Sequence, residues 1–281
     1  MSDNNELVRQ RSVVEFDQAK PERRQSTDHW YARGQNFVVE WVDGRSDGAT
    51  FQVTTAEEAF LLLPSAGATV KGAAGAVTAG SRTVCILPPG EFQVILDKAE
   101  PCACLYSDPA KLTMPGIINA SAYNPPDPRV APVTPKFKRV DRSTTVKVIE
   151  IDKITTQGKN SAMKVLQNAT MSMSWVNREG PRDRTSLSPH VHQDFEQGSL
   201  AIFGRFIHHL RVDWGKNADL WREDEHVQVP DRSLLVVPPG LIHTTQGNGE
   251  GAHLLIDIFS PARVDFIAKG FVANAADYVA E

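Results

Sequence analysis

The chain has 281 residues, 41% of them hydrophobic, which is enough for one large or two small domains with buried cores. Its formal net charge of −4 argues against a nucleic-acid-binding surface, and no apolar run approaches the length of a membrane span. The odd number of cysteines (Cys85, Cys102 and Cys104) and the polar start without an apolar leader predict reduced thiols in a cytoplasmic protein.

Residues 1–28 are polar and rich in charge, and we expect them to form an N-terminal arm on the surface. After them, short apolar runs alternate with turn residues. The runs at 37–42, 59–63 and 82–87 have the length and composition of β-strands, and a turn signal follows each one. This succession of short strands predicts an all-β fold, either a sandwich or a barrel.

Prolines punctuate residues 109–144, which we expect to be an extended connection packed along a surface. The alternating run 146–151 predicts the first strand of a second domain, which would cover residues 145–281. A further strand is expected at 170–176. Close to the C-terminus, residues 263–277 carry apolar side chains at helical spacing and predict a helix on the outside of this domain.

An internal repeat links the two halves. Residues 81–90 (SRTVCILPPG) match residues 231–240 (DRSLLVVPPG), with one arginine, two prolines and one glycine at identical places. Gln93 stands where the second copy has His243, and the first half contains no His-x-His motif. We therefore expect residues 29–108 to be a copy of the second domain that lacks metal ligands and that covers this domain or forms a subunit contact.

Three histidines of the second half have the spacing of metal ligands. His190 and His192 are two residues apart, and residues i and i+2 of a strand project from the same face. The Pro-Pro-Gly turn at 238–240 follows an apolar run and delivers His243 to the start of the next strand. The three imidazoles are therefore predicted to converge on one metal ion.

These two segments together resemble the two motifs of the cupin family, His-x-His followed by Glu and Gly, and Pro-x-Gly-x-x-His. The matching residues are His190, His192 and Gly204 for the first motif, and Pro238, Gly240 and His243 for the second. The resemblance covers residues 145–262. It implies a bicupin, with two jelly-roll β-barrels and a few short helices, one of them near the C-terminus, in which only the second barrel binds metal.

The next ligand of the cupin pattern has two candidates in this sequence. Glu196 fits the shorter spacing after His192, whereas counting back from Gly204 places Gln197 at the usual glutamate position. Adjacent strand residues face opposite sides, so only one of them is expected to bind the ion. The spacing favours Gln197, with Glu196 as the alternative. A neutral glutamine would leave the charge of a divalent ion uncompensated, and such a site attracts an anionic, chelating substrate.

Imidazole and oxygen donors suit Fe(II), which is our first expectation, with Mn, Ni or Zn as alternatives. Three further residues are candidates for catalysis. His208 and His209 lie side by side in a predicted strand, so one of them would point into the barrel as an acid–base group. Arg211, with Arg205 as the alternative, is expected to hold a substrate carboxylate.

Three functions remain open at this stage. The resemblance to bicupins implies first a metal-dependent dioxygenase that acts on a small carboxylated or enolisable anion, aromatic compounds included. The alternative is a non-redox isomerase, lyase or decarboxylase that uses the ion as a Lewis acid, since cupins with a glutamine ligand include such enzymes. The third is a binding protein without catalysis. We further expect a homodimer that has a small-molecule substrate and neither nucleic acid nor membrane as partner.

Overall fold

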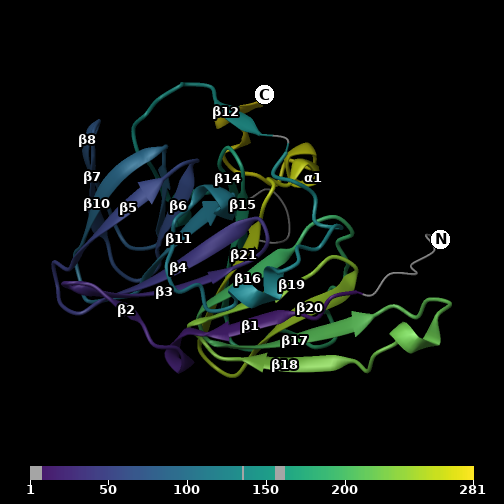
Figure 1. Ribbon diagram of the computed structural model, residues 1–281. Coiled ribbons are helices and arrows are strands. Elements are labelled where there is room, and N and C mark those ends of the chain that lie inside the picture. The colour runs from purple at the N-terminus through teal and green to yellow at the C-terminus, as the bar shows by residue number, and fades with distance from the viewer. Residues whose placement is uncertain (1–7, 135, 156–161) are drawn as a thin grey trace.

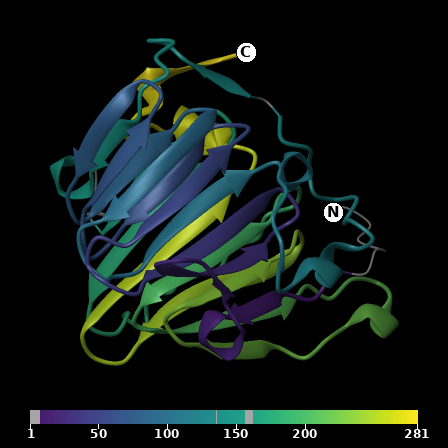
Figure 2. The same cartoon turned by 60° about the vertical axis from the view of Figure 1, so that its left-hand side comes forward.

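The computed structural model describes residues 8–134, 136–155 and 162–281, which fold almost entirely into β-strands. The strands form two barrels, so the predicted all-β, two-barrel fold is confirmed. Four main sheets follow one another as layers. They run from the small sheet of the first half, through the two large sheets, to the small sheet of the second half (Figures 1 and 2).

The first barrel encloses an apolar interior between a seven-stranded and a four-stranded antiparallel sheet. Strand alternation decides which side chains enter it, because Phe92, Val94 and Leu96 are buried while the residues between them are more exposed. In sheet order, the large sheet is β13 (Lys147–Glu150), β9 (Thr83–Leu87), β6 (Ala59–Leu63), β11 (Cys102–Ser107), β4 (Phe37–Gly44), β3 (Thr27–Arg33) and β2 (Glu22–Arg23). The small sheet is β5 (Thr50–Thr55), β10 (Gly90–Leu96), β7 (Ala68–Gly72) and β8 (Gly75–Ala79).

The second barrel lies between a six-stranded and a three-stranded antiparallel sheet. It contains two separate apolar clusters, one around Leu235 and one around Phe206, and it also buries polar side chains such as Ser199 and His243. In sheet order, the large sheet is β1 (Ser12–Glu15), β19 (Ser233–Val237), β16 (Gln197–Phe203), β21 (Ala252–Phe259), β15 (Ser172–Glu179) and β14 (Met163–Gln167). The small sheet is β18 (Glu225–Val229), β17 (Arg205–Val212) and β20 (Leu241–Asn248).

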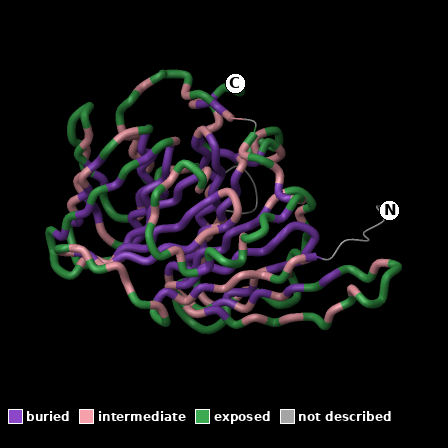
Figure 3. Tube along the Cα trace, viewed as in Figure 1, coloured by how far each residue is buried: buried purple, intermediate pink, exposed green. Residues whose placement is uncertain are grey.

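The two large sheets pack against each other and form the largest apolar cluster of the molecule. Trp41 and Leu105 of the first half meet Trp175, Leu200 and Ile256 of the second half in this layer. The strands of both large sheets are therefore buried on both faces, as the continuous purple segments in Figure 3 show. Burial on both faces explains why several of these strands are continuous apolar runs without alternation.

The halves exchange one strand each. β1 pairs with β19, where Ser12 lies opposite Val236, and β13 pairs with β9, where Lys147 lies opposite Ile86. Residues 12–15 are thus part of the second barrel's sheet and not a surface arm. The predicted strand at 146–151 exists, but it extends the sheet of the first barrel. Both additions cover strand edges whose backbone groups would otherwise lack partners. The remaining domain boundaries stay predictions.

The C-terminal helix is shorter than the sequence predicted. Only α1 (Val264–Ala268) is α-helical, because the chain turns at Gly270, whose φ of +70° ends the helix. The tail then forms β22 (Tyr278–Ala280), which pairs with β12 (Phe137–Arg139) of the connection. The short 3-10 helices are Phe16–Gln18, Pro109–Lys111, Ala120–Tyr123, Ile151–Lys153, Ala218–Leu220 and Ala275–Asp277. None of the helices in the described ranges is long and apolar enough to cross a membrane.

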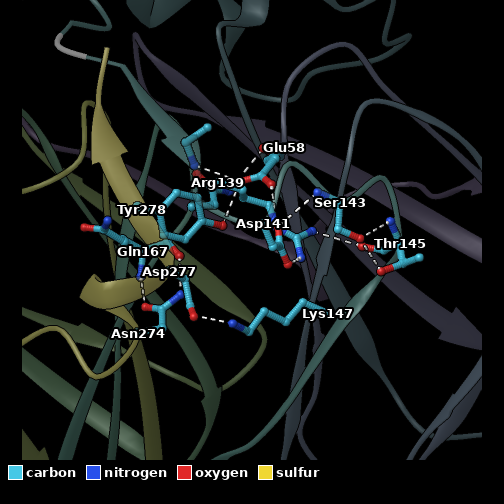
Figure 4. Close-up of polar contacts among 12 residues, drawn as sticks. Glu58, Arg139, Asp141, Ser143, Thr145, Lys147, Gln167, Asn274, Asp277 and Tyr278 are labelled. Atoms are coloured by element: carbon cyan, nitrogen blue, oxygen red, sulfur yellow. Dashed lines mark hydrogen bonds and ion pairs between the residues drawn. The ribbon is translucent and has the colours of Figure 1, made fainter.

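The C-terminal tail is bound to the buried carboxylate of Glu58, where the two halves of the chain meet (Figure 4). The hydroxyl of Tyr278 donates to Glu58 Oε2 at 2.8 Å, and the backbone N–H of Ala169 donates to the same oxygen at 2.9 Å. Arg139 Nε lies 3.9 Å from the other oxygen. Burial raises the pKa of Glu58, although these three neighbours act in the opposite direction. Glu58 thus joins the first half, the connection, the second half and the tail.

The exchanged N-terminal strand generates a first prediction. Phe16, directly after β1, is 0% exposed and stacks on Trp41 with 5.6 Å between ring centroids. We expect Phe16→Ala to lower the free energy of unfolding by about 3–5 kcal/mol, the usual cost of a buried phenylalanine. Chemical unfolding followed by tryptophan fluorescence measures this change.

The matched control is Phe271→Ala, since the side chain of Phe271 is 48% exposed. This substitution should cost about 0.5 kcal/mol or less. Equal losses for the two variants would mean that residues 1–28 are a surface arm after all.

Candidate metal centre

The three histidines come together at one end of the second barrel, although His190 and His192 lie in a loop and not in a regular strand. His190 forms an isolated bridge with His243 of β20, and backbone hydrogen bonds of 3.0 and 2.8 Å join the two residues. Gly240, with a φ of +81°, turns the chain into β20 and donates its N–H to the carbonyl of His192. The potential ligand atoms of the three histidines all lie within 4.8 Å of one another.

Gln197, the first residue of β16, places its side-chain oxygen among these imidazoles. Its Oε1 lies 3.2 Å from Nε2 of His192 and 3.2 Å from Nε2 of His243. Its Nε2 donates to Asp257 at 3.0 Å and to the hydroxyl of Ser199 at 3.2 Å. Because the carboxylate accepts from the amide nitrogen, the orientation of the amide is fixed, with the oxygen toward the histidines.

The tautomers of two histidines follow from their backbone partners. Nδ1 of His190 lies 3.0 Å from the carbonyl of Ser188, and Nδ1 of His243 lies 2.9 Å from the carbonyl of Leu241. A carbonyl only accepts, so both Nδ1 atoms carry the proton and both Nε2 atoms present a lone pair. The lone pair of His243 therefore faces the lone pairs of Gln197 Oε1, an arrangement that suits a cation bound between them.

The geometry and the charge state both fit such a cation. Two ligand atoms that meet a metal ion at right angles, each about 2.1 Å from it, lie about 3 Å apart. Burial holds the pKa of His192 at about 3 and that of His243 at about 4, so both imidazoles are neutral and free to bind metal. Three imidazoles and one amide oxygen suit a divalent transition metal. The role of these four residues as ligands remains our prediction.

The alternative residue, Glu196, points to the other side of the sheet. Its carboxylate accepts a hydrogen bond from the backbone N–H of Gln35 in the first half, and it is 6% exposed. Glu58 makes the equivalent contact from the first half to Ala169 of the second. Burial raises the pKa of Glu196 to about 7. The glutamate of the sequence pattern is thus used between the barrels, and Gln197 is the residue beside the imidazoles.

Two of the three predicted catalytic residues lie outside the barrel. Alternation along β17 turns His209 and Arg211 to the outer face, where His209 contacts His226 and Arg211 forms a two-point ion pair with Asp224. The structure therefore does not bring them to the imidazole group. His208 is buried inside the barrel, where burial lowers its pKa to about 3, but it does not line the cavity beside the imidazoles.

A cavity of about 520 Å³ opens beside the imidazoles. Its wall combines apolar side chains, among them Val176, Phe206 and Leu255, with several cations. The charged residues on this wall are Arg178, Arg182, Arg263, Lys269, Asp257 and Asp265. Sequence reasoning missed all of them. Arg182 belongs to a polar loop before the His-x-His motif, and no local pattern distinguishes it from a solvated residue.

Arg263 lies next to His192, whose pKa it helps to lower. Its guanidinium lies over the rings of Phe195, Phe259 and Phe266, with centroid distances of 4.4, 4.9 and 4.0 Å. Asp265 neutralises it through two hydrogen bonds of 2.7 Å. Arg263 is therefore a rigid, paired cation.

Comparisons with known proteins bear on the fold. No family model matches the chain, and no curated protein matches it either. Solved structures do match. A point mutant of Bacillus subtilis oxalate decarboxylase has a TM-score of 0.60 at 10% identity, over 92% of this chain and 79% of that chain. The chain has the bicupin fold. The Lactobacillus farciminis oxalate decarboxylase formate complex has a TM-score of 0.58 at 12% identity, over 92% and 90%.

The first barrel of this bicupin has a different interior. Within the described ranges, His190, His192 and His243 are the one group of three or more potential metal-binding side chains. The sequence repeat equates Gln93 with His243, but Gln93 is half-buried on the outer face of β10 and Phe92 points inward. The carboxylate of Glu40 inside this barrel accepts hydrogen bonds from His29 and Tyr31 at 2.7 and 2.9 Å.

The centre generates a prediction about its fourth donor. We expect Gln197→Ala to weaken metal binding by roughly 10- to 100-fold, a loss at least as large as that of a residue supporting a ligand. Gln197→Glu should retain the metal and lower the positive charge of the centre by one unit. Metal content of untagged protein and titration of the metal-free protein with Zn²⁺ measure both effects.

Glu196→Ala is the matched control. It should leave metal affinity unchanged and reduce the free energy of unfolding by about 1–3 kcal/mol, because the buried N–H of Gln35 loses its acceptor. If Glu196→Ala loses the metal while Gln197→Ala keeps it, the assignment of the ligand is reversed.

Proposed function

We propose that this protein is a metal-dependent lyase of the decarboxylase type, acting on an organic anion larger than oxalate. The observation that carries this proposal is the neutral donor set formed by His190, His192, His243 and Gln197. These residues line a cavity whose wall has more cationic than anionic side chains. Such a site keeps the full charge of a divalent ion, which attracts carboxylates and polarises their carbon–oxygen bonds. The bond that breaks joins the carboxyl carbon to its neighbour; carbon dioxide leaves and a proton replaces it.

The ion would supply Lewis acidity, and the chain's own residues would supply position and environment. Asp257 and Ser199 hold the amide of Gln197 in one orientation, which fixes its oxygen toward the imidazoles. Carbonyls fix the tautomers of His190 and His243. The apolar part of the wall, formed in part by Phe206 and Leu255, excludes water from the body of the substrate.

The size of the cavity supports a substrate larger than that named for the structural neighbours. Those neighbours are oxalate decarboxylases. A cavity of about 520 Å³ falls in the range that encloses drug-sized ligands. Oxalate, the smallest dicarboxylate, would fill only a small part of it.

A dioxygenase acting on the same class of anion is the second candidate. The apolar side chains on the cavity wall favour it, since they suit the enolisable or aromatic body that the sequence analysis anticipated. This reaction consumes dioxygen, whereas decarboxylation does not, so the two candidates separate in one measurement. The homodimer and Fe(II) expected from the sequence remain predictions.

The test starts from protein purified without an affinity tag and analysed for metal. The metal-free protein is then loaded with Fe(II), Mn(II), Ni(II) or Zn(II) and supplied with dicarboxylates and 2-oxo acids. We expect release of carbon dioxide without oxygen uptake, and we expect His243→Ala to reduce both metal content and turnover to background while the fold remains.

His226→Ala serves as the control, because His226 lies outside the barrel, where its ring contacts His209 on the outer face of β17. This variant should keep its metal and its turnover. Oxygen uptake with iron bound would establish the dioxygenase instead. Absence of any turnover with all four metals bound would leave only a binding protein.

A further inference from the structure

The cations on the cavity wall are of two kinds. Arg263 and Lys269 both form ion pairs with Asp265. In contrast, no carboxylate of the described residues lies within ion-pair distance of Arg178 or Arg182. Two guanidinium groups without acidic partners, in a partly desolvated cavity, form a site of unbalanced positive charge.

Arg182 is held firmly beside the imidazole group. Its Nη1 donates to the carbonyl of Thr245 at 2.7 Å, and its Nη2 donates to the hydroxyl of Ser188 at 2.9 Å. Its backbone N–H donates to the carbonyl of Gly247 at 3.0 Å. Three contacts to preformed structure mean that this guanidinium keeps one position and loses little entropy when a ligand binds.

The hydrogen-bond partners of Arg182 also show where this residue lies relative to the histidines. Ser188 and Thr245 are each two residues beyond the bridged pair of His190 and His243, on the same side of it. Two residues of extended chain cover about 7 Å. The groups that Arg182 binds therefore lie about 7 Å along the chain from the bridged histidines.

The surroundings of Arg182 leave its positive charge only partly compensated. Desolvation lowers its pKa, and the neighbouring cation Arg178 lowers it further, while the long-range effect of Asp257 only partly opposes this. A carboxylate at this place would relieve the repulsion and would accept from a planar fork of donors.

We propose that Arg182, assisted by Arg178, binds the distal carboxylate of a substrate whose other end binds at the histidine group. This inference rests on the proposed function, and it names the substrate class of the same site. The substrate is an organic dianion with acidic groups separated by several atoms, such as a C4 to C6 dicarboxylate or oxo acid. The side chains of Val176, Phe206 and Leu255 line the cavity for its apolar middle part.

The length requirement excludes oxalate as the preferred ligand. Its two carboxyl carbons are bonded directly to each other, so one oxalate ion at the histidines leaves Arg182 unsatisfied. A diacid whose carboxylates are separated by several atoms reaches both the histidines and Arg182.

The test is calorimetric titration of the Zn(II)-loaded protein with oxalate, succinate, glutarate and glutaramate. Glutaramate is the monoamide of glutarate, so it has nearly the same shape and lacks one charge. We expect glutarate or succinate to bind at least about tenfold more tightly than both oxalate and glutaramate, in line with a charged hydrogen bond. Equal affinity for glutarate and glutaramate would overturn the proposal without any use of a variant.

Variants then assign the preference to one side chain. Arg182→Gln should abolish the difference between glutarate and glutaramate, and Arg182→Lys should retain part of it. Arg184→Gln is the matched control, since this exposed arginine in the same loop is not part of the cavity wall and its loss should change nothing. Metal content of each variant confirms an intact centre. A preference for glutarate that survives in Arg182→Gln would assign the charge recognition elsewhere and overturn the proposal.

The outcomes for this inference and for the proposed function are distinguishable. Binding of glutarate through Arg182 without turnover under any metal would contradict the lyase and support the dianion site. Turnover of an acid with an unchanged KM in Arg182→Gln would support the lyase and overturn the role of Arg182.

Discussion

The architecture depends on a six-stranded sheet that has to be buried on both faces. One face packs on the large sheet of the other barrel, and the opposite face lines the second barrel's interior. Two consecutive residues at the start of β16 therefore point in opposite directions. Glu196, directly before the strand, reaches a backbone N–H of the first half, whereas Gln197 turns its amide to the histidines. Alternation along the backbone thus turns one side chain toward the first half and the next toward the histidines.

The two barrels treat buried polar groups in opposite ways. In the first barrel His29, Glu40 and Tyr31 pair donors with acceptors, so the cluster is satisfied as it stands. In the second barrel the lone pairs of His243 and Gln197 face one another. A satisfied network stabilises a closed interior, whereas converging lone pairs suit a bound cation. The difference in chemistry between the halves therefore lies in how donors and acceptors are matched and not in the fold, which both halves share.

Local patterns in the sequence were sufficient for the strands and for grouping His190, His192 and His243, whereas the two-barrel fold was predicted from the internal repeat and the resemblance to cupins. Strand alternation also indicated that Glu196 and Gln197 point apart. Alternation could not tell which face of β17 is the inner one, so Arg211 was wrongly expected near the substrate. The exchange of β1 and β13 and the position of Arg182 depend on contacts between residues distant in sequence. Such contacts have no signature in a local window, because the partner surface exists only after folding.

The exchanged strands affect how the protein folds while the ribosome synthesises it. β1 is synthesised before every other strand of the two barrels, yet its partner β19 emerges only after most of these strands have been made. The edge of β9 likewise has no pairing partner until β13 is synthesised, after the other strands of the first barrel and the connection. The nascent first barrel therefore has an unpaired edge at β9 until β13 has been synthesised, a state exposed to aggregation. The large sheet of the first barrel thus needs β13 from the second half, and the large sheet of the second barrel needs β1, so the two halves depend on each other for their final form.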